Sequence, residues 1–183
     1  VCSSDLDGTV TDLATQLVWD RCVLGLSGPT CAGTAQALSW VAAQAAVKAR
    51  NASGHLGFSD WRLPNKNELD SLLKLDTTNP AIDATAFPNT PASQHWSATT
   101  YAHSATKAWI TYFSIGLTSA FDIGLGFSVR LVRGGPWPAG FDGLACDLDV
   151  DGDGQMGYMR QACEQGELAE LKDEQGKPLV PGV

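Results

Sequence analysis

The segment Asp60–Leu73, DWRLPNKNELDSLL, constrains the fold of this chain more than any other stretch. Pro64 ends any element before it, and Asn65 followed three residues later by Glu68 matches a helix N-cap and its partner. The pattern predicts a helix over about residues 66–75. The apolar residues expected in the core are Trp61, Leu63, Leu69, Leu72 and Leu73.

The charged residues of this segment have two possible roles. Arg62 is expected to bind a nearby carboxylate, with Asp60, Glu68 and Asp70 as candidates. The functional alternative is that Asp60 or Glu68 acts as an acid or base. The cap gives Glu68 a local hydrogen-bonding role, and spacing supplies no second polar partner, so we interpret the segment as structural.

Two regions that come before this junction in the sequence also have recognisable patterns. Residues 8–21 suit a first strand or strand pair, with apolar residues at Val10, Leu13, Leu17 and Trp19. The alanine-rich residues 34–50 predict a helix. Its expected buried face is Leu38, Val41, Ala42, Ala45 and Ala46.

The second half of the domain has a different character. Residues 76–94 form a long irregular segment, and loops of that length are usually functional or packed by their own side chains. From His95 on, residues 95–101, 107–116 and 127–135 have strand composition, while the glycines of 117–126 indicate turns or bulges. This order of elements predicts an α+β domain.

Five cysteines stand at positions 2, 22, 31, 146 and 163, without the CxxC spacing of a zinc site. Cys22 with Cys31, and Cys146 with Cys163, each close a short loop, so we predict two disulfides in a secreted chain. Reduced, buried thiols in a cytosolic protein are the alternative.

Charge is distributed unevenly along the chain. The net charge is −8, but residues 1–135 hold nine Lys/Arg against ten Asp/Glu, while 136–183 hold three against ten. The acidity therefore belongs to the tail, and neither part has the basic character of a nucleic-acid-binding protein. The sequence contains no run of about 18 apolar residues, so it does not predict a membrane-spanning helix.

The first six residues, VCSSDL, are also the translation of a common sequencing-library adapter end, GTG-TGC-TCT-TCC-GAT-CT. We therefore hypothesise that residues 1–6 are an artefact on a truncated metagenomic fragment and carry no fold information. The source nucleotides test this hypothesis.

Five ordered motifs together resemble one bacterial family. They are VTDLATQLVWDRC (10–22), SDWRLPNKNELDSLL (59–73), NPAIDATAFPNTPASQHWSAT (79–99), AWITYFSIG (108–116) and VRLVRGG (129–135). Through them the segment from about Gly8 to Gly135 resembles the Lcl C-terminal domain family, typified by the C-terminal domain of a bacterial collagen-like adhesin.

The resemblance implies a C-type-lectin-like fold with two helices, a small twisted antiparallel sheet and a long loop region carrying the ligand surface. It implies adhesion outside the cell or on its surface, to a glycan or protein, and in some relatives a surface diversified by retroelements. The chain departs from the family at Leu131, where a cysteine is common. Only Lys107, Arg130 and Arg133 are basic between residues 94 and 135, which does not favour the family's binding of sulfated polysaccharides.

The residues expected to contact the ligand lie in and between the last strands. They mix aromatic side chains with small hydroxyl residues, a composition also typical of antibody binding sites. They are Tyr101, His103, Tyr112, Ser114, Thr118, Phe121 and Asp122. Strand alternation turns about half of such residues toward the core, so the set includes core positions as an alternative.

Catalysis is not expected. His55, His95 and His103 lack the spacings that place two imidazoles on one metal. Formylglycine-generating enzymes, which share the lectin-like fold, need reactive thiolates, and this domain has no cysteine after Cys31. An enzyme of that group and a purely structural adhesin module are the two alternatives to a ligand-binding module.

The acidic tail carries a second motif, in residues 146–164, after a linker-like stretch at 136–145 and before an end at 165–183 expected to be mobile. Its spacing matches an EF-hand or dockerin-type calcium loop through position 9, with Gly154 at the turn. The expected calcium ligands are Asp149, Asp151, Asp153 and the carbonyl of Gln155. Arg160 replaces the usual acid at position 12, so a solvated acidic linker is the alternative.

Overall fold

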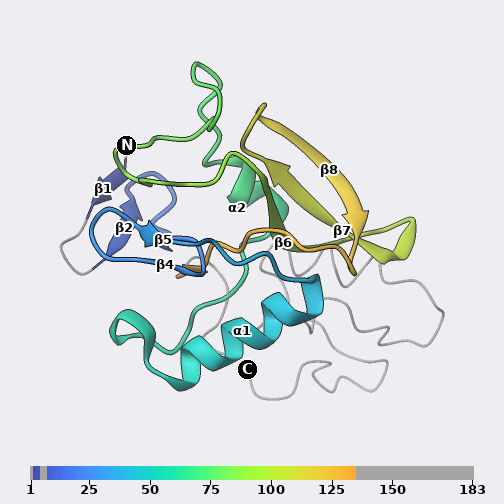
Figure 1. Ribbon diagram of the computed structural model, residues 1–183, viewed down its shortest axis with the longest axis horizontal. Helices are drawn as coiled ribbons and strands as arrows, with labels where there is room; N and C mark the ends of the chain where they lie inside the picture. Colours follow the sequence, from blue (N-terminus) through green and yellow to red (C-terminus); the bar gives the residue numbers. More distant parts are fainter. Residues whose placement is uncertain (1, 5–7, 135–183) are drawn as a thin grey trace, which may run out of the picture.

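The computed structural model of the protein describes residues 2–4 and 8–134 (Figure 1). Within that range it contains two α-helices, one short 3-10 helix and nine strands, all paired antiparallel. The predicted α+β class is confirmed, although the strands form three small sheets instead of one. No helix in this part of the chain is both long and apolar enough to cross a bilayer.

The first sheet joins the two ends of the domain. Its strands follow the order β1 (Cys2–Ser4), β2 (Thr9–Asp12), β3 (Val18–Asp20) and β9 (Val132–Arg133). Trp19 pairs with Val10 on one side and with Val132 on the other, and all three side chains are fully buried. The expected strand pair is thus confirmed, except that Leu13 lies in the turn and is 55 % exposed. The origin of residues 1–6 stays a prediction.

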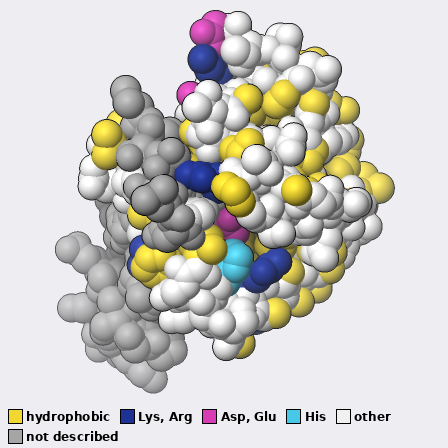
Figure 2. All heavy atoms as spheres, turned by 60° about the vertical axis from the view of Figure 1, so that its left-hand side comes forward, with side chains coloured by type: hydrophobic (Ala, Val, Ile, Leu, Met, Phe, Trp, Pro, Cys, Tyr) yellow, Lys and Arg dark blue, Asp and Glu magenta, His cyan; other side chains and the backbone are white. Residues whose placement is uncertain are grey.

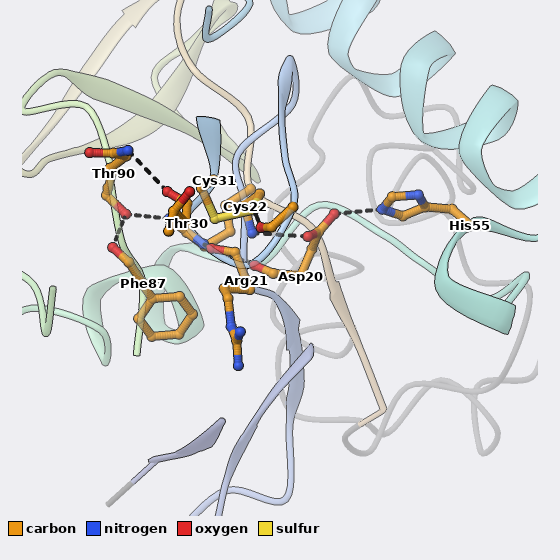
Figure 3. Close-up of a disulfide and its surroundings, with 11 residues drawn as sticks. Asp20, Arg21, Cys22, Thr30, Cys31, His55, Phe87 and Thr90 are labelled. Carbon is orange, nitrogen blue, oxygen red and sulfur yellow. Dashed lines mark hydrogen bonds and ion pairs between the residues drawn. A yellow bond between two sulfur atoms is a disulfide. The ribbon is translucent and has the colours of Figure 1, made fainter. Parts of the chain in front are cut away.

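A disulfide closes the hairpin of β4 (Leu26–Ser27) and β5 (Ala32–Gly33), as Figure 3 shows. The predicted pairing of Cys22 with Cys31 is confirmed, and both cysteines are buried. The other predicted disulfide, Cys146–Cys163, lies outside the described residues, as do the linker, the calcium loop and the tail.

Helix α1 (Trp40–Ala52) begins six residues later than predicted, after the N-cap Ser39. Residues before it are not helical because their N–H groups bond elsewhere: that of Gln36 donates to Leu24 O and that of Leu38 to Phe127 O. The predicted buried face is right only in part, because Leu38 and Ala46 are partly buried against the core but Val41 and Ala45 are exposed. The buried residues are Trp40, Ala43, Gln44 and Val47, whereas Val41 is 64 % exposed.

The indole of Trp40 sets the rotation of this helix. It is buried, and its Nε1 donates to Ser97 O at 2.9 Å, which ties the start of α1 to β6. One large side chain with a hydrogen-bond partner outweighs several alanines, which present little area to bury.

The junction at Asp60–Asp70 follows the prediction closely. Asn65 Oδ1 accepts a bond from Glu68 N, and Glu68 Oε2 accepts one from Asn65 N, both at 2.8 Å, so the capping box is confirmed. Trp61 and Leu63 are buried as expected. Arg62 binds Glu68 through two bonds of 2.7 Å, which selects Glu68 among the three candidate carboxylates.

Helix α2 (Lys66–Asp70) is shorter than the predicted range of 66–75. Ser71 caps its end by donating its hydroxyl to Glu68 O at 2.6 Å, and the N–H of Lys74 bonds to Ala81 O in the following segment. Leu69 and Leu72 are buried as predicted, and Leu73 is partly buried against them.

The third sheet consists of β6 (Gln94–Tyr101), β7 (Ser104–Tyr112) and β8 (Leu117–Asp122), in that order. The glycines of residues 117–126 were predicted to mark turns, and Gly124 does lie in a turn, but the preceding residues Leu117–Asp122 form a strand that was not predicted. Conversely, only Val132–Arg133 of the predicted strand 127–135 is a strand. Ser128 instead bonds to β6, donating its N–H to Gln94 O and accepting from Trp96 N, while Leu131 O accepts from Asp20 N, because this segment crosses from one sheet to another.

Two clusters make the core. One joins α1 to β6 and β7 through residues such as Trp40, Trp96 and Ile110. The other joins the first sheet to α2, and the long segment 76–94 contributes Ile82 and Phe87 to it. This segment is therefore packed by its own apolar side chains.

The buried side chain of Arg130 connects its own strand-like segment to the end of β3 and to the segment 76–94. Arg130 is fully buried, donates to the carbonyl oxygens of Asp20 (2.9 Å) and Arg21 (2.7 Å) and to Thr90 Oγ1 (2.6 Å), and lies over the Phe87 ring. Its burial lowers the pKa to about 10, opposed by the charge of Asp20.

His95 is also fully buried, with its ring against Phe113. Burial and then the charge of Arg130 lower the pKa of His95 to about 3, while the bond to Ser93 O opposes that shift. The imidazole is therefore neutral at physiological pH.

Candidate functional site

The tip that joins β6 to β7 carries two of the predicted ligand-binding residues. Tyr101 pairs with Ser104 across a two-residue turn that contains His103. The two rings pack edge to face, with centroids 5.4 Å apart. The strand register shifts between Trp96 and Tyr101, and such a bulge re-aims the side chains beside it.

A third ring from the neighbouring strand completes this aromatic surface. The centroid of Trp109, on β7, lies 5.4 Å from that of Tyr101 with the planes at 76°. Lys66, the first residue of α2, places its Nζ 5.4 Å from the centroid of the Trp109 ring. These groups border an open cavity of about 260 Å³. We call it the aromatic cavity; its lining residues are Lys66, Asn67, Thr99, Thr100, Tyr101, Ala102, His103 and Trp109.

A polar network holds α2 against this face of the sheet. The N–H of Lys66 donates to Thr99 Oγ1, and its Nζ pairs with Asp70 Oδ2, both at 2.9 Å. Asp70 Oδ1 accepts hydroxyl bonds from Thr111 (2.6 Å) and Thr118 (2.7 Å). Because Asp70 offsets the charge of Lys66, the aromatic cavity is nearly neutral and suits a hydroxylated ligand better than a strongly charged one.

The other predicted contact residues lie elsewhere. Tyr112 and Phe121 are partly buried against the α1 core cluster, where Phe121 also packs edge to face with Phe127. The hydroxyl oxygen of Ser114 is buried, and Asp122 accepts a bond from Gly124 N. With Thr118 bonded to Asp70, five of the seven predicted residues do not line the aromatic cavity.

Sequence reasoning missed Trp109, Lys66 and Asn67 as members of this surface. Trp109 stands one position from the buried Ala108 and Ile110, so strand alternation alone turns its ring to the other face of the sheet. The sequence therefore contained the information needed to place Trp109 on that face. The approach of Lys66 was not, because it depends on how α2 packs against β6 and β7.

Histidine, cysteine and acidic side chains also occur elsewhere in the described residues. His55 Nε2 lies 2.7 Å from Asp20 Oδ2, and its Nδ1 lies 3.4 Å from Arg50 Nη1, so the pair faces a cation and not a nucleophile. Both cysteines of residues 8–134 are used in the disulfide. Among the described residues, no group of three or more His, Cys, Asp or Glu could hold a metal ion.

The fold and this surface define a small α+β, disulfide-closed module with an aromatic cavity at a hairpin tip. Residues 8–133 match the family model of the Lcl C-terminal domain. The chain belongs to this family, an adhesin-associated type of domain and not a known enzyme family. No curated protein matches the chain.

Proposed function

We propose that this protein is a non-catalytic, secreted or surface-displayed adhesion module that binds a glycan through the aromatic cavity. The observation that carries the proposal is the convergence of Tyr101, His103 and Trp109 on one open cavity that also holds Lys66 and Asn67. The adhesin-associated family and the Cys22–Cys31 disulfide support a place outside the cytosol.

The cavity has the two kinds of group that sugar recognition needs. Aromatic rings offer apolar area to the C–H faces of a sugar at small entropic cost. Asn67 offers an amide and Lys66 an ammonium for hydroxyl groups at the ring edge. The volume of about 260 Å³ fits one sugar unit, so we propose weak binding per site, strengthened by multiple copies on a surface. We also propose the C-type-lectin-like fold, with diversification of this region in some relatives.

The test is a glycan array probed with the full chain and with Trp109→Ala. We expect signal for at least one glycan class and its loss in the variant. Leu75→Ala is the matched control, because Leu75 is 78 % exposed and does not line the cavity. Equal loss in both variants, or no glycan signal from the unaltered chain, would argue against the proposal.

A protein ligand is the second candidate, favoured by an apolar group at the other end of the hairpin. Leu75, Ile115 and Leu117 are 78 %, 59 % and 60 % exposed, and a Cβ added at Gly116 would lie 3.1 Å from Leu75 Cδ2. Such contiguous apolar exposure is typical of protein contacts. Capture of a protein from an array that is lost in Leu117→Ser and kept in Trp109→Ala would favour this candidate.

We further propose that the tail binds Ca²⁺ weakly through Asp149, Asp151, Asp153 and Gln155, a proposal that rests on the sequence pattern alone. Isothermal titration with CaCl₂ tests it, with Asp151→Ala as the variant. Binding at millimolar or lower concentration that Asp151→Ala abolishes supports the loop. Absence of heat, or equal heat in both proteins, contradicts it.

A further inference from the structure

The described structure holds a second, larger cavity that shares no lining residue with the aromatic cavity. Its volume is about 570 Å³, within the usual range for small-molecule sites. We propose that this cavity binds a carboxylate attached to a partly apolar body, with the Arg50 guanidinium as the anchor. We call it the Arg50 cavity.

Four separate parts of the chain build its walls. The end of β3 contributes Asp20 to Cys22, the disulfide-closed hairpin contributes Gly25 to Pro29, the last turn of α1 contributes Arg50, and η1 (His55–Gly57) contributes His55 and Leu56, with Gly8 at the rim. Figure 2, which brings the left-hand side of Figure 1 forward, shows histidine, acidic and basic side chains close together among hydrophobic ones on one face of the molecule. In Figure 1 the hairpin β4–β5 and the tip of β6–β7 lie on opposite sides.

Arg21 and Arg50 both line this cavity, and Arg50 is the cation that the proposal concerns. The Asp20 carboxylate is occupied: Oδ1 accepts from Cys22 N at 3.0 Å and Oδ2 lies 2.7 Å from His55 Nε2 (Figure 3). Arg50 is half-buried, and its polar contact is with the His55 Nδ1 at 3.4 Å. No carboxylate among the described residues lies within ion-pair distance of Arg50.

Arg50 differs in this from Arg62 and Arg133, while the buried Arg130 donates to carbonyl and hydroxyl oxygens. Arg62 is paired with Glu68 and Arg133 with Asp60, each through two short bonds. A guanidinium presents five donors in a planar fork that matches a carboxylate. Because Arg50 is half-buried, lines the cavity and has no carboxylate partner among the described residues, its guanidinium is poised to bind such a group of a ligand.

The rest of the cavity favours a ligand that is more than an inorganic ion. Leu26, Pro29 and Leu56 present apolar surface beside Arg50, and Gly28 leaves open space where a side chain would otherwise stand. A ring or short hydrocarbon on the carboxylate gains from leaving water against these side chains. Bare sulfate or phosphate would gain nothing from them.

The probe is benzoate, with benzamide as its neutral isostere and sulfate as the inorganic anion, each titrated into the full chain and followed by amide NMR shifts. We expect benzoate to shift the amides of Ser27, Gly28 and Leu56, and benzamide and sulfate to leave them nearly unchanged. Arg50→Gln is expected to weaken benzoate binding roughly tenfold or more, the usual loss of a charge-assisted pair.

Two variants make the result decisive. Lys48→Gln, an exposed cation on the same helix, is the matched control and should bind benzoate as before. Ser27→Trp should block the cavity while leaving Arg50 in place, which covers the case of an unfolded Arg50→Gln. Equal shifts with benzamide or sulfate, undiminished binding in either test variant, or no benzoate binding by the unaltered chain would overturn the proposal. None of these outcomes depends on glycan binding at Trp109.

Discussion

The junction Asp60–Asp70 and the tip that joins β6 to β7 lie close together on the same cavity but differ in how firmly the fold holds them. At the junction four short side-chain bonds hold the chain, two in the capping box and two between Arg62 and Glu68. At the tip, the side chain of His103 is exposed, and its ring packs edge to face with the ring of Tyr101. The segment that best identifies the family thus builds the scaffold, and the proposed ligand surface lies beside it.

The largest loss of stability is expected from Glu68→Ala. It removes both bonds to Arg62 and one half of the capping box, and it leaves a guanidinium whose side chain is 8 % exposed. Breaking such a pair costs about 3–5 kcal/mol in the free energy of unfolding, measured by urea titration.

Asp83→Ala is the matched control for Glu68→Ala. Asp83 also accepts backbone N–H bonds, from Thr85 and Ala86, but it is exposed and has no cation within ion-pair distance among the described residues. We expect a cost under about 1 kcal/mol for it. Similar losses in the two variants would show that the junction is not the firmer region.

The second-largest expected effect is a dependence of the free energy of unfolding on pH, which comes from His95. Its pKa lies near 3 in the folded state against an ordinary value of 6.5, so the unfolded chain binds more protons between these values. The stability that neutral His95 contributes is complete above pH 6.5 and falls as the pH drops toward 3. At pH 5 we expect roughly 2 kcal/mol less than at pH 7.5 from this residue.

The measurement compares urea unfolding of the unaltered chain and of His95→Gln at both pH values. Contributions of the carboxylates are shared by the two proteins and cancel in the difference. The variant is expected to lose less stability on acidification. If both lose the same amount, His95 does not titrate as described.

A smaller loss is expected from Thr118→Val, which removes the hydroxyl bond to Asp70 Oδ1 and keeps a β-branched side chain in β8. A hydrogen bond to a charged acceptor contributes about 1.5–3 kcal/mol, and we expect the lower end because Asp70 keeps its bonds to Thr111 and Lys66. Thr106→Val, whose hydroxyl contacts Ser104 on the exposed part of β7, should cost less. Thr118→Val should still bind the glycan. Loss of glycan binding in this variant would indicate that Thr118 contacts the ligand, as the sequence predicted.

The smallest effect on stability is expected from His103→Ala, under about 0.5 kcal/mol, because its side chain is exposed. Glycan binding should nevertheless fall, since one ring of the aromatic cavity is lost. His55→Ala is the contrasting variant: it should lower stability by removing the contact with Asp20 and leave glycan binding intact. If His103→Ala lowered stability but kept glycan binding, and His55→Ala kept stability but lost glycan binding, the distinction between scaffold and ligand surface would be wrong.

The accuracy of the sequence predictions follows the range of the interactions. The capping box, the burial of Trp61 and Leu63 and the Cys22–Cys31 disulfide depend on neighbours within about ten residues along the chain or on strong apolar preference, and all are confirmed. The start of α1 was wrong because the N–H groups of Gln36 and Leu38 bond to Leu24 and to Phe127. Alanine-rich composition favours a helix but contains no information about such competing partners.

The candidate site shows the same limit. Tyr101 and His103 were predicted because they are aromatic residues in the last strands, but the choice of cavity depended on a register shift in β6 and on the packing of α2. The Arg50 cavity had no sequence signal, because its walls come from two regions that are distant in the chain, residues 20–29 and residues 50–56.

By itself, the sequence determined the α+β class, the family and the junction that supports the domain, because periodicity, caps and cysteine spacing act over short distances. Only the tertiary structure decided which face of α1 is buried, that residues 117–122 pair as a strand, and which polar groups meet around Trp109 and Arg50. These outcomes depend on contacts between segments far apart in sequence, whose energies no local pattern contains.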